Sequence, residues 1–163
     1  MKKFIDTKVY VWWMSASFVL AVICGAIASY SMYHVEPKIQ ALLDEGEIMY
    51  NDIQKSEDKI KTEAEVSELY TKAYVLLRDP QIFARYEYYD SEAAPIKQIL
   101  VKFDKIVADG KKIQPDHKLY LDVLYKRRLQ GSKLTFSSMI FFLSLTALAG
   151  VFLIIEKVKT KNF

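Results

Sequence analysis

Two long apolar runs lie near the two ends of the chain. The first, Val9 to Tyr33, contains 25 residues without a charge, and the second, Leu134 to Ile155, contains 22. A helix rises about 1.5 Å per residue and the hydrocarbon core of a bilayer is about 30 Å thick, so about 20 apolar residues cross it. We therefore predict transmembrane helices over residues 9–34 and 134–155.

The first run also has features of a secretory signal sequence. Ala26-Ile27-Ala28 fits a small-residue cleavage site, but the apolar region of a signal peptide is usually only about 7–15 residues long. Amphipathic rings favour membrane interfaces, and such rings flank this run: Tyr10, Trp12 and Trp13 on one side, Tyr30 and Tyr33 on the other. A membrane span is the better interpretation.

Lysines in the short flanks predict the topology. The tails, residues 1–8 and 156–163, each carry three lysines, and cytoplasmic flanks are enriched in Lys and Arg. Lys126, Arg127, Arg128 and Lys133 precede the second span, but long loops translocate largely regardless of charge. We predict a bacterial inner (plasma) membrane protein with both tails cytoplasmic and residues 35–133 periplasmic or extracellular.

The first half of this middle segment has helical periodicity. Its apolar or small positions alternate in steps of three and four: Ile39, Leu42, Gly46, Met49, Ile53, Ser56 and Ile60. Gly46 and Ser56 weaken this pattern. Pro37 fits the first turn of a new helix or kinks a continuing one. Thr62 to Glu65 has capping-box spacing, and a further stripe ends at Asp79-Pro80, so residues 39–77 form one helix or two.

The second half predicts two more helices. One begins at Ser91, takes Pro95 in its first turn and ends at Asp109-Gly110. Its apolar face comprises Ile96, Ile99, Leu100, Phe103, Ile106 and Val107, with Lys97, Lys102, Asp104 and Lys105 opposite. The other runs from Pro115 to Gly131, after which Ser132 caps the second span. The predicted fold is all-α, with two transmembrane helices flanking a small extracytoplasmic helical domain of three to four helices.

Charge is distributed unevenly along the middle segment. Acidic residues predominate from His34 to Glu68 and basic residues from Leu69 to Lys133, so an acidic helix pairs with a basic one or both faces are simply solvated. The chain carries a net charge of +3, which arises largely from the lysine tails. No clustered basic face of the kind that binds nucleic acid is apparent, and we predict no nucleic-acid partner.

Residues with catalytic or metal-binding chemistry are few. Cys24 is the single cysteine, which excludes an intrachain disulfide and a cysteine-based zinc site. His34 lies two residues from Met32 and from Glu36, but alternate positions of a helix do not face each other. Asp116-His117 has the chemistry of a helix start, and the sequence lacks a phosphate-binding glycine loop or nucleophile elbow. We predict no enzymatic activity, no metal and no cofactor.

Two groups of residues are candidates for contacts with partners. Small residues recur every fourth position on the first span, at Ser17, Ala21, Gly25 and Ser29, and Thr146 and Gly150 repeat this spacing on the second. Such faces let helices approach closely in a bilayer, so the partner is the protein's own second span, another subunit or a second copy. Between Pro80 and Asp90, the aromatic residues Phe83, Tyr86, Tyr88 and Tyr89 form a partner surface or close the end of the helical domain.

These features favour a non-catalytic accessory or scaffolding subunit of a larger membrane assembly. It would contact membrane lipid and bind other membrane protein subunits, or a second copy, through its spans and its helical domain. The alternative is an extracytoplasmic sensor or ligand-binding module that signals through a partner subunit. The eight residues after the second span hold no output domain, which favours the accessory interpretation.

Overall fold

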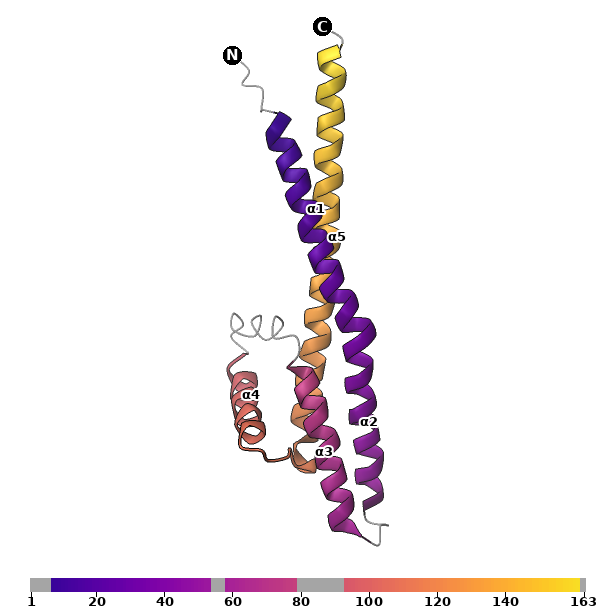
Figure 1. Ribbon diagram of the computed structural model, residues 1–163, viewed down its shortest axis with the longest axis vertical. Helices are drawn as coiled ribbons and strands as arrows, with labels where there is room; N and C mark the ends of the chain where they lie inside the picture. The colour runs from indigo at the N-terminus through magenta and orange to yellow at the C-terminus, as the bar shows by residue number, and fades with distance from the viewer. Residues whose placement is uncertain (1–6, 54–57, 79–92, 162–163) are drawn as a thin grey trace. The chain divides into compact units, whose positions relative to one another are not determined.

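The computed structural model describes residues 7–53, 58–78 and 93–161, and over this part of the chain it is helical and contains no strand (Figure 1). The all-α prediction is confirmed. In chain order the elements are α1 (Thr7–Tyr30), the π-helical turn η1 (Ser31–Val35), α2 (Glu36–Asp52), α3 (Lys59–Leu77), α4 (Ala93–Ala108), the 3-10 turn η4 (Pro115–His117) and α5 (Lys118–Lys161). The chain forms two compact units, the long-helix unit (Met1–Tyr30 with Lys133–Phe163) and the bundle unit (Ser31–Ser132).

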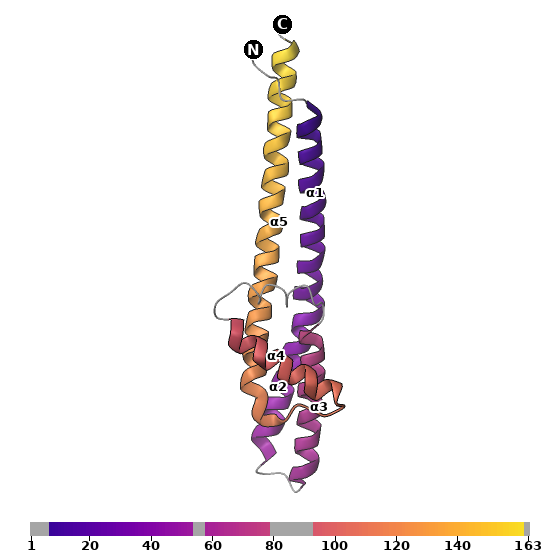
Figure 2. The same cartoon turned by 90° about the vertical axis from the view of Figure 1, so that its left-hand side faces the viewer.

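The long-helix unit pairs α1 with the second half of α5. The two helices lie side by side in both views, with the start of α1 and the end of α5 at the same end (Figures 1 and 2). Tyr10 stacks on Phe152 with ring centroids 6.1 Å apart. A Cβ at Gly25 would lie 2.8 Å from the Met139 sulfur, so the glycine marks the close approach of the pair.

Two helices are long and apolar enough to cross a membrane, one over Lys8–Asp52 and one over Pro115–Lys159. In the most apolar 18-residue stretch of the first, 17% of the residues are buried within the structure, and in that of the second none is. A core helix of a water-soluble protein would instead be mostly buried. Most of the large apolar side chains of this unit are therefore exposed at its surface.

The bundle unit has its own apolar core, made by one face each of α2, α3, α4 and the first turns of α5. Its buried members include Ile39, Leu43, Val66, Tyr70, Tyr74, Phe103, Ile113 and Leu121. Most of the predicted stripe from Ile39 to Ile53 faces this core, whereas Ile60 is exposed. Gly46 is buried where the Tyr70 ring of α3 packs against α2. In the sequence pattern Gly46 weakened the apolar stripe, but in the structure its lack of a side chain makes room for the Tyr70 ring.

Residues 39–77 form two helices, which resolves the alternative left open by the sequence. The first helix ends after Asp52, and the second begins at Lys59 with Asp58 as its N-cap. The Asp58 carboxylate accepts a hydrogen bond from the Lys61 amide at 3.0 Å. The predicted capping box at Thr62 is wrong, because the helix starts three residues earlier and the Thr62 hydroxyl donates to the Asp58 carbonyl.

Helix α4 packs on α3 through an aromatic and an ionic contact. Phe103 is fully buried and meets Tyr74 edge to face, with ring centroids 5.3 Å apart. Asp104, which was predicted on the polar side of α4, has a side chain that is 44% exposed and also contacts α3. Its carboxylate accepts hydrogen bonds from the Tyr74 hydroxyl at 2.6 Å and from Arg78, whose guanidinium binds both carboxylate oxygens.

The predicted ends of α3 and α4 are confirmed. Helix α3 ends at Leu77, just before Asp79-Pro80. Helix α4 ends at Ala108, and Gly110 follows with a positive φ of 68°. The Gly110 amide donates to the Val107 carbonyl and the Lys111 amide to the Ile106 carbonyl, the paired bonds of a Schellman motif. Ser91, the predicted N-cap of α4, lies outside the described residues.

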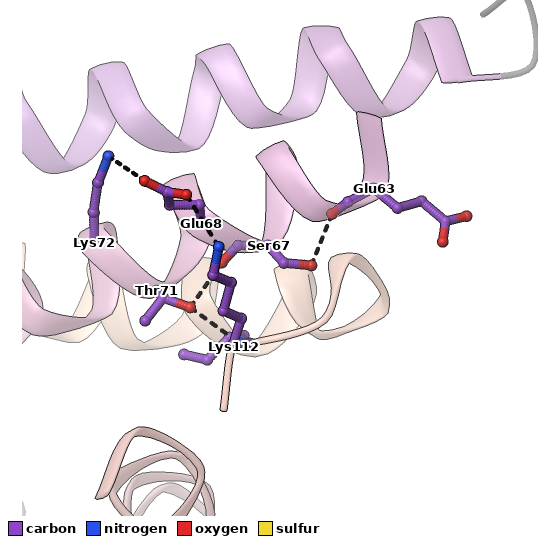
Figure 3. Close-up of polar contacts among 7 residues, drawn as sticks. Glu63, Ser67, Glu68, Thr71, Lys72 and Lys112 are labelled. Atoms are coloured by element: carbon purple, nitrogen blue, oxygen red, sulfur yellow. Dashed lines mark hydrogen bonds and ion pairs between the residues drawn. The ribbon is translucent and has the colours of Figure 1, made fainter. Parts of the chain in front are cut away.

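The segment after α4 is held against α3 by polar contacts (Figure 3). The Ile113 amide donates to the Thr71 hydroxyl at 2.9 Å. The Glu68 carboxylate contacts Lys72 at 2.9 Å and Lys112 at 3.0 Å, and hydrogen bonds from Lys72 and then Lys112 lower the Glu68 pKa to about 2. Both partners are about half exposed, so these pairs position the segment and stabilise it little.

The predicted helix end at Gly131 is wrong. Helix α5 runs through this residue without interruption, and Ser132 does not cap a new helix. Glycine in a helix interior costs only about 1 kcal/mol relative to alanine. The side chains on either side of Gly131, those of Arg128 and Ser132, are both buried in polar contacts of the bundle unit. These tertiary contacts outweigh the local preference.

Candidate functional site

A buried polar cluster lies within the bundle unit where η1, α2 and α5 meet. It consists of Ser31 from η1, Glu36 from α2, and Arg128 and Ser132 from α5, a set that we call the polar cluster. Each of the four side chains belongs to a residue that is at most 6% exposed. Charged side chains are almost never buried to this degree unless they are paired, so the cluster is the most unusual chemical feature of the described residues.

Hydrogen bonds connect all four side chains. The Ser31 hydroxyl donates to Glu36 Oε1 at 3.1 Å, and Ser132 donates to the same oxygen. Arg128 Nη2 donates to the Ser31 hydroxyl at 3.1 Å. Ser31 thus joins the guanidinium to the carboxylate through one hydroxyl, which is how a buried polar network satisfies its members.

Arg128 also closes the end of α3. Its Nη1 donates to the carbonyls of Leu76 at 3.1 Å and Leu77 at 2.9 Å, the last residues of that helix. The final carbonyls of a helix have no intrahelical donor and carry partial negative charge, so a guanidinium is a favourable partner. One arginine on α5 thereby connects α3 to η1.

The π-helical turn η1 immediately precedes α2, and Pro37 lies in the first turn of that helix. Proline lacks an amide proton, and its ring presses on the carbonyl four residues earlier, here that of Tyr33. A π turn widens the helix by one residue and makes room at this position. The sequence left a kink or a restart open at Pro37, and the structure shows a continuing helix with a π turn.

The chemistry of the polar cluster is that of a structural connection. Its carboxylate and the two terminal nitrogens of its guanidinium bind side chains and backbone of the same unit. Breaking a buried pair by removing one partner typically costs about 3–5 kcal/mol, whereas replacing the whole group by apolar side chains can be neutral. Such clusters therefore specify one arrangement of helices more than they stabilise it.

The small-residue face of α1 is partly covered by the protein's own α5. Ser17 and Ala21 are buried and Gly25 faces Met139, whereas Ser29 is exposed. On α5, a Cβ at Gly150 would meet no atom within 4 Å, and the Thr146 hydroxyl donates to the Phe142 carbonyl of its own helix. The close contact to α1 is thus made at Met139 and not at the Thr146–Gly150 pair.

The other candidate residues are distributed as follows. The possible partner surface of Phe83, Tyr86, Tyr88 and Tyr89 lies outside the described residues. Cys24 is a partly buried free thiol. His117 lies beside Asp116 in η4, and its Nε2 is 2.9 Å from Lys102 Nζ. Among the described residues no group of three His, Cys, Asp or Glu side chains could hold a metal ion.

Ion pairs join the acidic and the basic halves of the bundle unit at two places. Lys118 Nζ is 3.0 Å from Glu47 and 3.0 Å from Asp122, and Lys112 pairs with Glu68. Beside the first group, the Tyr70 hydroxyl is buried without a hydrogen-bond partner among the described residues. Burial raises the pKa of Tyr70 to about 12.

Sequence reasoning missed the polar cluster. Glu36 follows the first apolar run and Arg128 precedes the second. In the sequence, both therefore resemble ordinary charged residues at a membrane interface. The sequence contains one weak indication of the cluster: Ser31 and Glu36 are five positions apart, and Pro37 follows directly. The role of that spacing becomes visible only when α5 supplies Arg128 and Ser132.

Comparisons of the chain with protein-family models, with curated proteins and with solved structures find no match in any of the three. Functional conclusions therefore depend on the residues and the geometry described above.

Proposed function

We propose that this protein is a non-catalytic accessory or scaffolding subunit of a larger membrane protein assembly. It would bind neighbouring subunits, or a second copy of itself, through its two spans and its helical bundle. Membrane lipid would cover the remaining apolar surface.

The observation that carries this proposal is the outward-facing apolar surface of the long-helix unit. Large side chains of α1 and α5 that are about half exposed or more include Trp12, Phe18, Val22, Phe141 and Ile154. Soluble monomers rarely expose contiguous apolar patches larger than a few hundred Å². Lipid and partner helices are the environments that favour such a surface.

Hydroxyl groups in the second span are consistent with this environment. Ser137, Ser138, Ser144 and Thr146 each donate to the carbonyl four residues earlier in α5, at 2.9–3.0 Å. Inside a bilayer, polar groups need partners within the protein because water is absent. These side chains have such partners without any contribution from solvent.

For topology we propose cytoplasmic tails and an extracytoplasmic bundle in a bacterial inner membrane, supported by the lysines in both flanks. Single cysteines can test this in a Cys24→Ser background, using Glu45→Cys on the bundle and Lys159→Cys near the end of α5. Both positions are exposed. An impermeant maleimide should label only Glu45→Cys in intact cells and both variants after permeabilisation; the reverse pattern would show the opposite orientation.

A sensor that signals through a partner subunit is the second candidate. It is favoured by the bundle unit, a separate helical domain with its own apolar core that lies in the chain between the two long apolar helices. A sensor would change its contacts with the partner when a ligand binds, whereas a scaffold would not.

Copurification from the native membrane tests the subunit function. Extraction in mild detergent should yield the protein with other membrane proteins or a second copy in fixed stoichiometry. Ser29→Leu places a bulky side chain on the exposed part of the small-residue face and should reduce copurification without lowering the amount of protein. Val22→Leu is the matched control, since position 22 already carries an exposed large apolar side chain.

Monomeric extraction of the wild type would contradict the subunit proposal. A stoichiometric complex that Ser29→Leu and Val22→Leu weaken equally would place the interface elsewhere on the protein.

A further inference from the structure

We infer that the bundle unit docks onto a second copy of this chain, with the exposed face of α4 in one copy lying on the exposed face of α2 in the next. The two faces carry opposite charge at matching spacing. This inference rests on the proposed subunit function, because it names the partner and the surface through which the bundle unit binds it.

The exposed face of α4 carries an apolar side chain between two lysines. Val101 is 60% exposed, and Lys97 and Lys105, which are also exposed, lie four residues before and after it. Positions four apart are neighbours on one face of a helix. We call these three residues the basic stripe. The one acidic residue of α4, Asp104, binds Arg78 of α3.

The exposed face of α2 repeats this arrangement with the opposite charge. Ile48 is 65% exposed, and the exposed residues Asp44 and Asp52 lie four residues before and after it. We call these three residues the acidic stripe. Glu45 adds exposed negative charge beside the stripe, whereas the one basic residue of α2, Lys38, lies near the other end of the helix.

The two stripes are complementary when one lies on the other. Four residues of helix rise about 6 Å, so each stripe places its two charges about 12 Å apart with the apolar side chain midway. Val101 then packs on Ile48 while each lysine meets an aspartate, which gives the apolar centre and polar rim of a protein interface. Because each stripe has the same charge at both ends, the helices can meet in either direction.

The exposed face of α3 differs because it carries both signs of charge. Its Glu68 pairs with Lys72 of the same helix and with Lys112 (Figure 3). The charge of α3 is therefore partly neutralised within the chain, whereas each stripe presents a single sign. Two stripes of the same sign repel each other, so each stripe favours the other as its partner. Every copy of the chain displays both.

The stripes lie too far apart to meet within one chain. Helices α4 and α2 are on opposite sides of the bundle unit, with α3 and the first turns of α5 between them (Figures 1 and 2). A contact between the stripes therefore joins two copies head to tail, and each copy retains its other stripe for the next copy. Heterologous contacts of this kind form rows or closed rings.

A contact between one stripe of each helix is small, and small interfaces are typical of weak association. Copies that lie in one membrane with the same orientation meet at a high effective concentration, which compensates for a low affinity. The experiment therefore uses the full chain in membranes.

Interchain disulfide trapping tests the inference. Two differently tagged copies are coexpressed in a Cys24→Ser background, one with Ile48→Cys and the other with Val101→Cys, and the isolated membranes are oxidised. The two tags should become linked by a disulfide, and each copy should crosslink mainly to the other and little to its own kind. An ionic strength of about 1 M should weaken this crosslink, because the Debye length falls to about 3 Å.

Charge reversal gives the decisive comparison. Lys97→Glu with Lys105→Glu on the Val101→Cys copy should lower crosslinking about tenfold, because two attractive pairs become repulsive. Asp44→Lys with Asp52→Lys on the Ile48→Cys copy should lower it equally. When both reversals are combined, the charges are opposite again and crosslinking should recover. Recovery also shows that both reversed copies are folded.

Lys59→Glu with Lys61→Glu on the Val101→Cys copy is the matched control. Both lysines are exposed on α3 and lie outside the stripes, so the pair of substitutions changes the net charge equally and should leave crosslinking unchanged. The inference is overturned if the two cysteines do not crosslink, if the control acts as strongly as the reversed stripe, or if the combined reversal restores nothing.

The same experiment separates this inference from the subunit proposal. Absence of the crosslink from a protein that still copurifies with other membrane proteins would overturn the inference and leave the subunit proposal standing. Absence of the crosslink together with monomeric extraction would contradict both.

Discussion

The contact between Gly46 and Tyr70 allows a test of how the bundle unit is packed. In the Gly46→Ala variant the new Cβ would lie 3.0 Å from Tyr70 Cδ1 and 3.3 Å from Cζ, and closer still to Cε1. The ring belongs to a residue with no exposed surface, so it cannot swing into solvent. The two helices must therefore move apart or the ring must leave its preferred position.

The expected magnitude combines two opposing effects. Overpacking a core costs about 1–3 kcal/mol, whereas replacing a helix-interior glycine by alanine gains about 1 kcal/mol. The net result is a destabilisation of about 0–2 kcal/mol. Gly150→Ala separates the two effects, because its Cβ would meet no atom within 4 Å. The difference in unfolding free energy between the two variants should then be about 1–3 kcal/mol.

Thermal unfolding of the full-length protein in detergent, followed by circular dichroism, measures this difference. For a domain of about 100 residues, 1 kcal/mol corresponds to a shift in Tm of about 4–8 °C. Tyr70→Leu should remove most of the penalty of alanine at position 46 in a double-mutant cycle. A Gly46→Ala protein as stable as Gly150→Ala, or no coupling to Tyr70→Leu, would refute the packing described here.

Two further predictions concern the same core. Phe103→Ala should lower the unfolding free energy by about 3–5 kcal/mol, because the ring is fully buried between Tyr74 and His117; an unchanged melting transition would contradict this. Tyr70→Phe should remove a pH dependence above pH 10. Burial raises the folded pKa of Tyr70 from 10.0 to about 12, so the unfolded chain loses this proton first and wild-type stability falls as pH rises from 10 to 12. Denaturant unfolding at pH 9 and pH 11 should show a steeper loss for wild type than for the variant.

The ends of several helices could be predicted because their causes are local. Asp79-Pro80 prevents α3 from continuing, and Gly110 supplies the positive φ that ends α4. The apolar face of α4 was also predictable, since its period follows from helix geometry alone. In each case the information lies within about one helical turn of the feature.

Other features depend on residues far apart in the sequence and could not be read from local patterns. In the sequence of α2 alone, Gly46 interrupts an apolar stripe. In the structure it is the position at which Tyr70 of α3 contacts α2. Gly131 has the chemistry of a helix end, yet Arg128 and Ser132 are buried on either side of it and the helix continues. Asp104 falls on the polar side of α4 and is nevertheless drawn to Tyr74 and Arg78.

The polar cluster follows the same logic at greater distance in sequence, since Ser31 and Ser132 are separated by 101 residues. Apolar side chains would give comparable stability at these positions without the cost of burying charge. What they would not give is a fixed register, because apolar faces can pack in more than one alignment. A fixed register is most important next to long apolar helices, because the hydrophobic effect does not drive such helices together within lipid. The hydrogen bonds of Glu36 and Arg128 can all form in only one alignment of η1, α3 and α5. We expect this selectivity to explain why charged groups occupy the interior of so small a bundle.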